Sequence, residues 1–406
     1  MICVDEARQI IIAAAQNISW RSETLPLHQI LGRVAADDIL ANITQPPFNA
    51  SAMDGYAVNF DDMALGAKLT IIGEAAAGNP IDIKVRRGQA VRIFTGSSVP
   101  DGANHIIIQE DVERQGDNII VKNVQPTARN IRKSGIDFNE GDMILPKGTR
   151  ILAPHLSILA AANIAEIKCL CRPRLAFFTN GDELKEPGAT LKQGEIINSN
   201  PYSIAAFIEH WGGEAINLGC APDNPQAISD LFAHACGNDV HADIIIPIGG
   251  ASVGDYDYVK SAFAENGGRI IFSKIAVKPG KPTWFGAMHG RHVLGLPGNP
   301  ASALVMAALF IQPLIKAYYG EKFTDLSMQL PLATSIEANG PRENYMRAKI
   351  IYGPNNQRYI QPADNQDSSL LSPFATHHHL IRRIANAPAL NKGDLAEIYP
   401  LFGEAL

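Results

Sequence analysis

The sequence predicts a multidomain protein of the α/β plus β class. After Pro173, apolar strand-like runs alternate with helical stretches. Between about residues 45 and 148, Gly and Pro separate short β-branched runs, and short strands return from about residue 326. We therefore expect four parts: a helical stalk (1–44 plus 149–172), an inserted β-rich module (45–148), a doubly wound, mostly parallel α/β domain (173–322) and a C-terminal β domain (323–406).

The stalk is predicted from the helical spacing of apolar residues in the segments on either side of the β module. Residues 4–18 are expected to form an amphipathic helix, because apolar residues recur at helical spacing: Val4, Ala7, Ile10, Ile11, Ala14 and Ile18. A second helix is expected over 27–40 and a third over 154–165. The β module is then an insertion between the second and third helices. Its strands are expected in the runs KLTIIGEA, QAVRIFTG, HIIIQEDV and NIIVKNV.

The α/β domain is predicted from four apolar strands separated by helical stretches. The strands are 175–179, 215–218, 244–248 and 270–275, and the helices are 201–211, 224–236 and 256–266. A longer helix is expected over 300–318. Alternating strands and helices give parallel strands, and ligands bind beyond the carboxyl ends of such strands. The loops after these strands are therefore the first place to look for a functional site.

Composition limits the classes of function. The chain has 406 residues, of which 46% are hydrophobic and 19% charged, so it is too apolar to be disordered. A net charge of −6 argues against a basic nucleic-acid-binding surface. No uninterrupted apolar run reaches the ~18 residues of a membrane span. Five scattered cysteines without zinc spacing, and an N-terminus without a basic leader pattern, favour a cytoplasmic protein with a small-molecule substrate.

Four polar clusters follow the predicted strands or precede the last helix of the α/β domain. They are Thr179-Asn-Gly-Asp-Glu183, Gly249-Gly-Ala-Ser-Val-Gly254 with Asp255 and Asp257, Lys278-Pro-Gly-Lys281, and Leu296-Pro-Gly-Asn-Pro300. Glycine turns let backbone N–H groups approach an anion, and paired lysines add positive charge for an oxyanion. Carboxylates beside an anion indicate a divalent cation or proton transfer. The combination favours a Mg²⁺-nucleotide or phosphate site.

Each cluster also has a purely structural interpretation. A Gly-Gly turn is more often a tight turn than a phosphate cradle, and a lone lysine pair fits a solvated surface. Four clusters at the strand ends of one sheet nevertheless favour a functional cleft. In the β module, Asp54 of SAMDGYA, Thr95 of VRIFTG, and Arg132 and Asp137 of IRKSGID lie near glycines. The residues alone leave open whether these four act in function or only in turns.

Together the motifs resemble one family, the molybdopterin molybdenumtransferases of the MoeA type, which are related to the C-terminal domain of gephyrin. The resemblance rests on these segments, in family order: PPFNASAMDGYAV, AVRIFTGSSVPDGA, NIRKSGIDF, FTNGDEL, GGASVGDYDYV, AVKPGKP and GLPGNPASA. It covers essentially the whole chain.

The resemblance implies a fold and an activity. The expected protein is an elongated homodimer with a molybdopterin-binding α/β domain, a C-terminal β-barrel-like domain and an active cleft that involves both protomers. The expected enzyme of molybdenum cofactor biosynthesis inserts molybdate into the dithiolene of adenylylated molybdopterin and releases AMP with the help of Mg²⁺. A molybdopterin adenylyltransferase and molybdoenzyme chaperones would be its protein partners.

The resemblance also implies roles for individual residues. Catalytic roles are implied for Asp54, Thr95, Asp137, Asp182, Glu183 and Asp257, of which the last three are candidate Mg²⁺ ligands. Contacts with the molybdopterin substrate are implied for Arg132, Gly249, Gly250, Ser252, Gly254, Pro297 and Pro300. Molybdate contacts are implied for Lys278, Lys281, Ser302 and, by a looser alignment, Arg347 and Ser368 or Ser369.

Several positions depart from the commonest family pattern. Asn180 stands where Thr is usual, Ala251 replaces Val, Ile136 replaces an acidic residue, and Asn49 stands where Asp or Arg is common. Ile136 weakens the expectation of metal or dimer contacts in the β module.

Two other functions stay open. The flanking β domains argue against a molybdopterin adenylyltransferase, and the retained acidic and lysine residues argue against a non-catalytic gephyrin-like scaffold.

Overall fold

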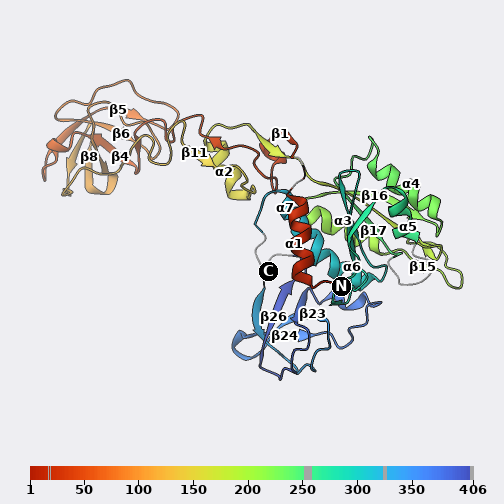
Figure 1. Ribbon diagram of the computed structural model, residues 1–406. Helices are drawn as coiled ribbons and strands as arrows, with labels where there is room; N and C mark the ends of the chain where they lie inside the picture. The colour runs from red at the N-terminus through yellow and green to blue at the C-terminus, as the bar shows by residue number, and fades with distance from the viewer. Residues whose placement is uncertain (17, 19, 251–257, 323–326, 403–406) are drawn as a thin grey trace. The chain divides into compact units, whose positions relative to one another are not determined.

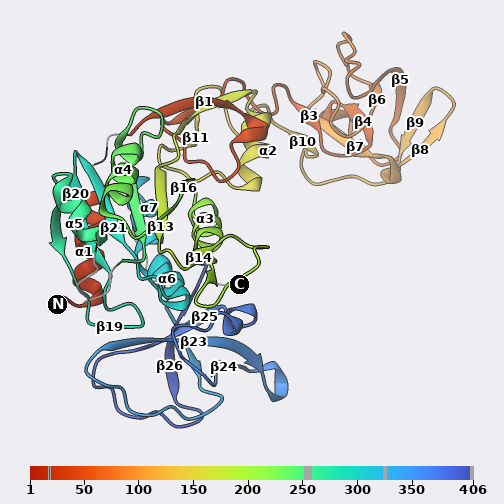
Figure 2. The same cartoon turned by 90° about the vertical axis from the view of Figure 1, so that its right-hand side faces the viewer.

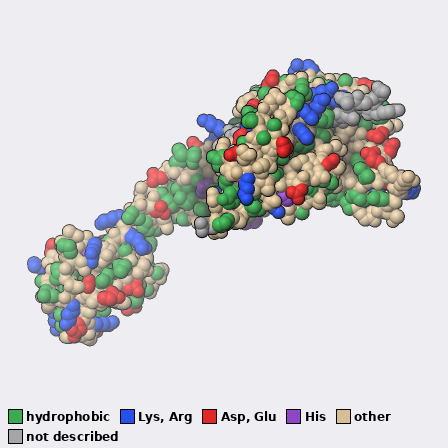
Figure 3. Space-filling view, turned by 90° about the horizontal axis from the view of Figure 1, so that it is seen from below, with side chains coloured by type: hydrophobic (Ala, Val, Ile, Leu, Met, Phe, Trp, Pro, Cys, Tyr) green, Lys and Arg blue, Asp and Glu red, His purple; other side chains and the backbone are tan. Residues whose placement is uncertain are grey.

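The computed structural model describes residues 1–16, 18, 20–250, 258–322 and 327–402 (Figure 1). The chain divides into two compact units. The larger unit comprises Met1–Ser22 and Leu170–Leu406, and the smaller unit comprises Glu23–Cys169. On the face shown in Figure 3, basic and acidic side chains are interspersed with apolar ones on the visible part of each unit.

A six-stranded sheet forms the centre of the larger unit. Its strands are, in order, β16 (Glu214–Ala221), β13 (Arg174–Asn180), β17 (Ile244–Ile248), β21 (Arg291–Gly295), β20 (Trp284–Met288) and β18 (Arg269–Phe272). β13 pairs in parallel with β16 and β17, and β17 pairs in parallel with β21, whereas β20 runs antiparallel to both of its neighbours. All strands except β20 therefore share one direction, which confirms the mostly parallel sheet.

Helices cover both faces of this sheet, because its central strands β13 and β17 are apolar and buried on both sides. The helices are α3 (Asn200–His210), α4 (Pro225–Cys236), α5 (Tyr258–Glu265) and α6 (Pro300–Met306). Ala176 and Phe178 of β13 pack in one core cluster with residues of α4 and α5. Figure 2 shows α4 and α5 on one side of the sheet and α3 and α6 on the other. The doubly wound prediction is confirmed.

α6 continues through a π-helical turn (η4, Ala307–Ile311) into α7 (Gln312–Tyr318). Among the described residues, this run forms the one helix that is long enough and apolar enough to cross a membrane. However, 89% of its most apolar stretch is buried inside the fold. α1 (Val4–Ala15) packs against α7, with Val4, Ala7 and Ile11 fully buried. The sequence placed this first helix in the stalk. That placement was wrong, because the apolar stripe of α1 is buried in the larger unit.

The C-terminal part of the larger unit is a second sheet. Its strands are, in order, β19 (Val277–Lys278), β23 (Glu343–Tyr352), β25 (His379–Arg383), β26 (Leu395–Pro400) and β22 (Met328–Pro331), and β24 (Arg358–Pro362) also pairs with β23. Leu332, which directly follows β22, forms a parallel bridge with Ile360 of β24. This bridge brings the sheet round on itself, as expected for a barrel-like domain. Two 3₁₀ turns, η5 (Pro354–Asn356) and η6 (Ser372–Ala375), lie in its loops. A short parallel pair, β14 (Leu184–Lys185) with β15 (Ile196–Ile197), completes the strands of the larger unit.

The smaller unit contains a six-stranded β sheet and short strand pairs. The sheet order is β7 (His105–Ile108), β4 (Gly55–Val58), β6 (Gln89–Ile93), β5 (Lys68–Ala75), β9 (Asn118–Val121) and β8 (Val112–Gln115). The pairs are β1 (Ser22–Pro26) with β12 (Glu166–Leu170), β2 (Ile39–Leu40) with β11 (Met143–Leu145), and β3 (Ala50–Ser51) with β10 (Ile131–Arg132). Its helical elements are α2 (Ala153–Ala161) and the 3₁₀ turns η1 (Leu27–Gln29), η2 (Phe60–Asp62) and η3 (Gln109–Asp111).

The helix predicted over residues 27–40 is wrong. One 3₁₀ turn, η1, is followed by Gly32 in the left-handed region (φ 75°) and then by largely extended backbone. Val34 forms a bridge with Arg150, and Ala35 forms one with Cys169. The apolar residues of this segment therefore reach the core through strand-like pairing, and their helical spacing is coincidental. The other domain boundaries stay predictions.

The buried side chain of His105 leads us to expect that the smaller unit loses stability at acidic pH. It is fully buried, and its Nδ1 accepts a hydrogen bond from the Arg129 N–H at 3.0 Å. Burial lowers the pKa of His105 below its usual value. Below pH ~6.5 the unfolded chain binds a proton at this histidine that the folded chain does not bind. The free energy of unfolding should therefore decrease as the pH is lowered, by up to ~1.4 kcal/mol per pH unit.

Amide exchange in β4 and β7, measured between pH 5 and 8, tests this prediction. His105→Gln keeps a hydrogen-bond acceptor but does not titrate, so it should flatten the pH dependence of the unfolding free energy. An unchanged pH profile in this variant would show that another group is responsible.

Candidate functional site

A pocket of about 690 Å³, the sheet-end pocket, opens at the carboxyl ends of β13 and β17. Its lining includes Thr179, Asn180, Glu183, Asn198, Asn200, Gly249, Gly250, Pro297, Gly298, Asn299 and Pro300. The buried Asn198 side chain donates to Thr179 Oγ1 at 2.8 Å, and Asn200 Nδ2 donates to the Gly298 carbonyl at 2.8 Å. These bonds tie the start of α3 to β13 and to the turn before α6.

Two glycine turns meet at this pocket. The Gly249 N–H donates to the Leu296 carbonyl at 3.0 Å, and Ile248 forms a parallel bridge with Leu296. Gly250 has a positive φ of 60°, and a Cβ there would come within 2.3 Å of Val259 Cγ2, so the position requires glycine. The structure thus brings Gly249 and Gly250 together with Pro297 and Pro300, as predicted. Ser252, Gly254 and Asp257 lie outside the described residues.

Carboxylates lie at and beside the mouth of the sheet-end pocket. Glu183 lines the pocket and Asp182 is exposed next to it. Asp182 Oδ1 accepts from the Asp223 N–H at 3.3 Å, and the Asp223 carboxylate accepts from Asn180 Nδ2 at 3.0 Å. Asp223 is a candidate that the sequence analysis missed, because the loop after the second strand was not considered. The signal was present in Pro222-Asp-Asn224, which directly follows β16.

A second pocket of about 620 Å³, the lysine pocket, lies beside the first. The two share Pro282, Pro297 and Asn299 in their linings. The lysine pocket is also lined by Lys278, Lys281, Ser302, Arg347, Asp367 and Ser368. Both lysine side chains are exposed, whereas Ser302, in the first turn of α6, is only 4% exposed.

Gly280 shapes the turn that carries the two lysines. It has a φ of 103°, and a Cβ would come within 2.4 Å of Met306 Sδ. Thr283 Oγ1 donates to the Gly280 carbonyl at 2.8 Å. The Lys278 to Lys281 turn is therefore packed closely against α6. This packing fixes the backbone of a turn whose two lysines both line one pocket, and a pair of positive charges there suits a dianion.

Arg347 organises one wall of the lysine pocket. The residue is 2% exposed, and its Nη atoms donate to the carbonyls of Leu370 at 2.7 Å, Asp367 at 2.9 Å and Asn365 at 3.2 Å. Ser369 Oγ donates to Asp367 Oδ1 at 2.6 Å, and this contact lowers the pKa of Asp367. Arg347 and Ser369, expected as molybdate contacts, are thus engaged with the 365–370 loop. Ser369 lines the sheet-end pocket and Ser368 the lysine pocket.

Arg347→Ala should detach this loop. The variant removes the three hydrogen bonds that the buried Arg347 donates to carbonyls of this loop, and we expect it to lower the free energy of unfolding by about 3 kcal/mol and to make the 365–370 loop sensitive to protease. Arg347→Lys should recover little, because an ammonium cannot reproduce the planar fork. Thermal unfolding and limited proteolysis measure both effects. The exposed Arg358 on β24 supplies the control, Arg358→Ala; equal losses in the two variants would contradict the prediction.

In the smaller unit, Asp54 and Thr95 form a direct pair. Asp54 Oδ1 accepts from the Thr95 N–H and from Thr95 Oγ1, each at 2.8 Å. These hydrogen bonds, and more weakly the charge of Arg92, lower the pKa of Asp54. A Cβ on Gly55 would lie 1.8 Å from the Ile107 carbonyl oxygen, so β4 and β7 approach closely there. Asp54 is therefore an exposed, ionised carboxylate held in place by a turn.

Arg132 and Asp137 lie in the same unit, on β10 and in the loop that follows it. Arg132 of β10 is the register partner of Ala50 in β3. The Asp137 N–H donates to the Gln45 carbonyl at 3.2 Å. Both side chains are exposed. Among the described residues no hydrogen bond to the Asp137 carboxylate is found, so a turn role for that side chain has no support.

Comparison with known proteins agrees with this geometry. Three family models match the chain: the MoeA N-terminal region (domain I and II) over residues 2–163, a probable molybdopterin binding domain over 176–317, and the MoeA C-terminal region (domain IV) over 329–401. A molybdopterin molybdenumtransferase of Haemophilus influenzae is 38% identical over 403 residues, which is 98% of each chain. One from a Nostoc species is 33% identical and covers 80% of this chain and 76% of its own.

Solved structures match as well. A structure of the molybdopterin biosynthesis MoeA protein of Pyrococcus horikoshii superposes with a TM-score of 0.84, 28% identity and 99% coverage of both chains. A structure of a molybdopterin biosynthesis MoeA protein from Pyrococcus horikoshii OT3 gives a TM-score of 0.82 at 26% identity, covering 98% of this chain and 99% of the other. With matches along nearly its whole length, in sequence and in fold, the chain belongs to the MoeA family of molybdopterin molybdenumtransferases.

Proposed function

We propose that this protein inserts molybdate into the dithiolene of adenylylated molybdopterin and releases AMP, as a step of molybdenum cofactor biosynthesis. The observation that carries the proposal is the pair of adjoining pockets, one lined by glycine turns and the other by Lys278 and Lys281, with Pro282, Pro297 and Asn299 common to both. Two oxyanions can then lie side by side. The family and the curated relatives support the same reaction.

The two pockets suit two different anions. Molybdate is a compact tetrahedral dianion, and the two ammonium groups of the lysine pocket can donate charge-assisted hydrogen bonds to it. A phosphate of the pterin substrate suits the sheet-end pocket, where the Gly249 to Gly250 turn and the turn before α6 expose backbone. Glu183 and Asp182 at the mouth can accept a proton from the water that cleaves the phosphoanhydride.

Magnesium fits the proposed site only together with the substrate. Among the described residues no group of three His, Cys, Asp or Glu side chains is arranged to hold a metal ion. Mg²⁺ is commonly held by one or two carboxylates plus substrate phosphates, so one of Asp182 and Glu183 would hold it there while the other stays free to accept the proton. Its chemistry would be to neutralise charge on the bridging phosphates.

AMP release from adenylylated molybdopterin by the purified protein, with and without molybdate, tests the proposal. We expect molybdate to be required for rapid release and a chelator to stop it without unfolding the protein. Formation of adenylylated molybdopterin from ATP would instead support an adenylyltransferase. No turnover of either kind would favour a scaffold.

The assembly and location are also proposals. We infer a cytoplasmic homodimer that takes small-molecule substrates and receives adenylylated molybdopterin from an adenylyltransferase. Light scattering of the purified protein tests the dimer, and a monomeric mass at assay concentration would contradict it.

A further inference from the structure

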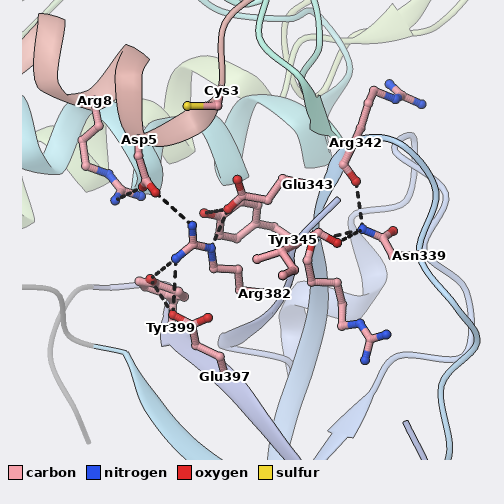
Figure 4. Close-up of polar contacts among 12 residues, drawn as sticks. Cys3, Asp5, Arg8, Asn339, Arg342, Glu343, Tyr345, Arg382, Glu397 and Tyr399 are labelled. Atoms are coloured by element: carbon pink, nitrogen blue, oxygen red, sulfur yellow. Dashed lines mark hydrogen bonds and ion pairs between the residues drawn. The ribbon is translucent and has the colours of Figure 1, made fainter. Parts of the chain in front are cut away.

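One guanidinium joins three segments of the larger unit (Figure 4). Arg382, on β25, donates from Nε to Glu343 Oε1 at 2.6 Å, from Nη2 to Asp5 Oδ2 at 3.1 Å, and from Nη1 to Glu397 Oε1 at 3.4 Å. The side chain of Arg382 is 14% exposed, and that of Glu343 is 11% exposed. Such partly buried, multiply bonded pairs have a fixed geometry, unlike pairs on an open surface.

Glu343 connects this guanidinium to the strand that begins the lysine turn. Glu343 is the first residue of β23, and its register partner is Val277 of β19. Its N–H donates to the Ala276 carbonyl at 3.0 Å. Lys278 is the next residue of β19 and pairs with Asn344. The position of β23 therefore sets the position of the Lys278 backbone.

Asp5 connects the guanidinium to the opposite side of the same segment. Asp5 lies in the first turn of α1, three residues after Ile2. The Ile2 N–H donates to the Lys274 carbonyl at 3.2 Å, and the Ala276 N–H donates to the Ile2 carbonyl at 2.8 Å. Residues 274–278 thus run between the N-terminal segment and β23, and Arg382 bonds a side chain from each.

We propose that Arg382 is a positioning residue for the molybdate lysines. By bonding Asp5 and Glu343, it clamps the two backbone segments that flank residues 274–278, and so fixes where the Lys278 to Lys281 turn faces the lysine pocket. The inference rests on the proposed function of these lysines. It assigns to Arg382 no contact with molybdate, since its donors are directed at Asp5, Glu343, Glu397 and Tyr399.

A merely stabilising role is the competing explanation. Removing Arg382 outright would leave the nearly buried Glu343 carboxylate without its cation, and the variant could fail to fold. Asp5→Asn is the milder test, because the Asp5 side chain is 58% exposed and the Arg382 pair with Glu343 remains. Glu6→Gln is a control for charge alone: it removes one charge from the same helical turn, at an exposed side chain, and leaves the Asp5 pairs with Arg8 and Arg382 in place.

Two readouts are needed. In molybdate titrations of AMP release, Asp5→Asn should raise the half-saturating molybdate concentration about two- to fivefold, and Arg382→Lys about tenfold, with the rate at saturating molybdate and the affinity for adenylylated molybdopterin unchanged. Amide exchange over residues 274–282 should become faster in both variants. Glu6→Gln should change neither quantity.

The outcomes separate this proposal from the proposed function. If Lys281→Ala shifts the molybdate dependence but Asp5→Asn and Arg382→Lys do not, the positioning role is wrong even where amide exchange rises. If Arg382→Lys lowers the rate and pterin affinity together, its role is general stability. If Lys281→Ala itself leaves the molybdate dependence unchanged, the assignment of the lysine pocket to molybdate fails, and the positioning proposal fails with it.

Discussion

Lys281→Ala is expected to raise the molybdate concentration for half-maximal AMP release by about one to two decades, while binding of adenylylated molybdopterin is spared. Loss of one charge-assisted contact typically costs ~1.5 to 3 kcal/mol, which corresponds to that shift. Lys281 lines the lysine pocket and not the sheet-end pocket. Lys278→Ala should act in the same direction but more weakly.

Lysine and arginine should not be interchangeable at position 281. The flat guanidinium fork is a poorer match than an ammonium for a compact tetrahedral dianion, so Lys281→Arg should restore little. Titration of molybdate, with pterin binding followed separately, measures the effect. Lys392→Ala, at an exposed lysine in the turn before β26, is the control. If pterin binding collapses and the molybdate dependence stays, these lysines hold the phosphate instead.

The α/β domain was predictable because burial on both faces of its sheet leaves a strong local pattern. The helices α3 and α4 begin and end within one residue of their predicted bounds, and α5 ends one residue before its predicted end. The segment 27–40 shows where this reasoning fails. Its apolar residues have helical spacing, yet Val34 and Ala35 are paired with Arg150 and Cys169, more than 100 positions away. Local periodicity carries no information about such distant partners.

The local motifs of the candidate site could be predicted from the sequence, but the contacts between distant segments could not. The glycine turns and lysines were found because each is a local motif, and α/β topology places strand ends together. The role of Arg347 could not be found in this way, since it depends on a loop about 20 residues further along the chain that folds back on it. Nor could the clamp at Arg382, which joins residues 5, 343 and 397.

Two substitutions at Asp54 can distinguish a role of its negative charge from a role of its hydrogen bonds in the turn. Asp54→Ala removes both hydrogen bonds from Thr95, whereas Asp54→Asn keeps an acceptor at the same place and removes only the charge. If the carboxylate acts in catalysis, both variants should lose AMP release by about two to four orders of magnitude. Asp137→Ala should lose activity similarly without any change in thermal unfolding, because the Asp137 side chain is exposed.

The pH dependence of AMP release gives an independent check on Asp54. Because Thr95 lowers the pKa of Asp54, the carboxylate is ionised above that lowered pKa and protonates only at more acidic pH than an ordinary aspartate. Titration of Asp54 should therefore cause no loss of activity between pH 5 and 7, either in the unmodified protein or in Thr95→Ser, which can keep both hydrogen bonds. Activity and thermal unfolding are measured on the same preparations. Full activity in Asp54→Asn, with unfolding only in Asp54→Ala, would make Asp54 a turn residue and nothing more.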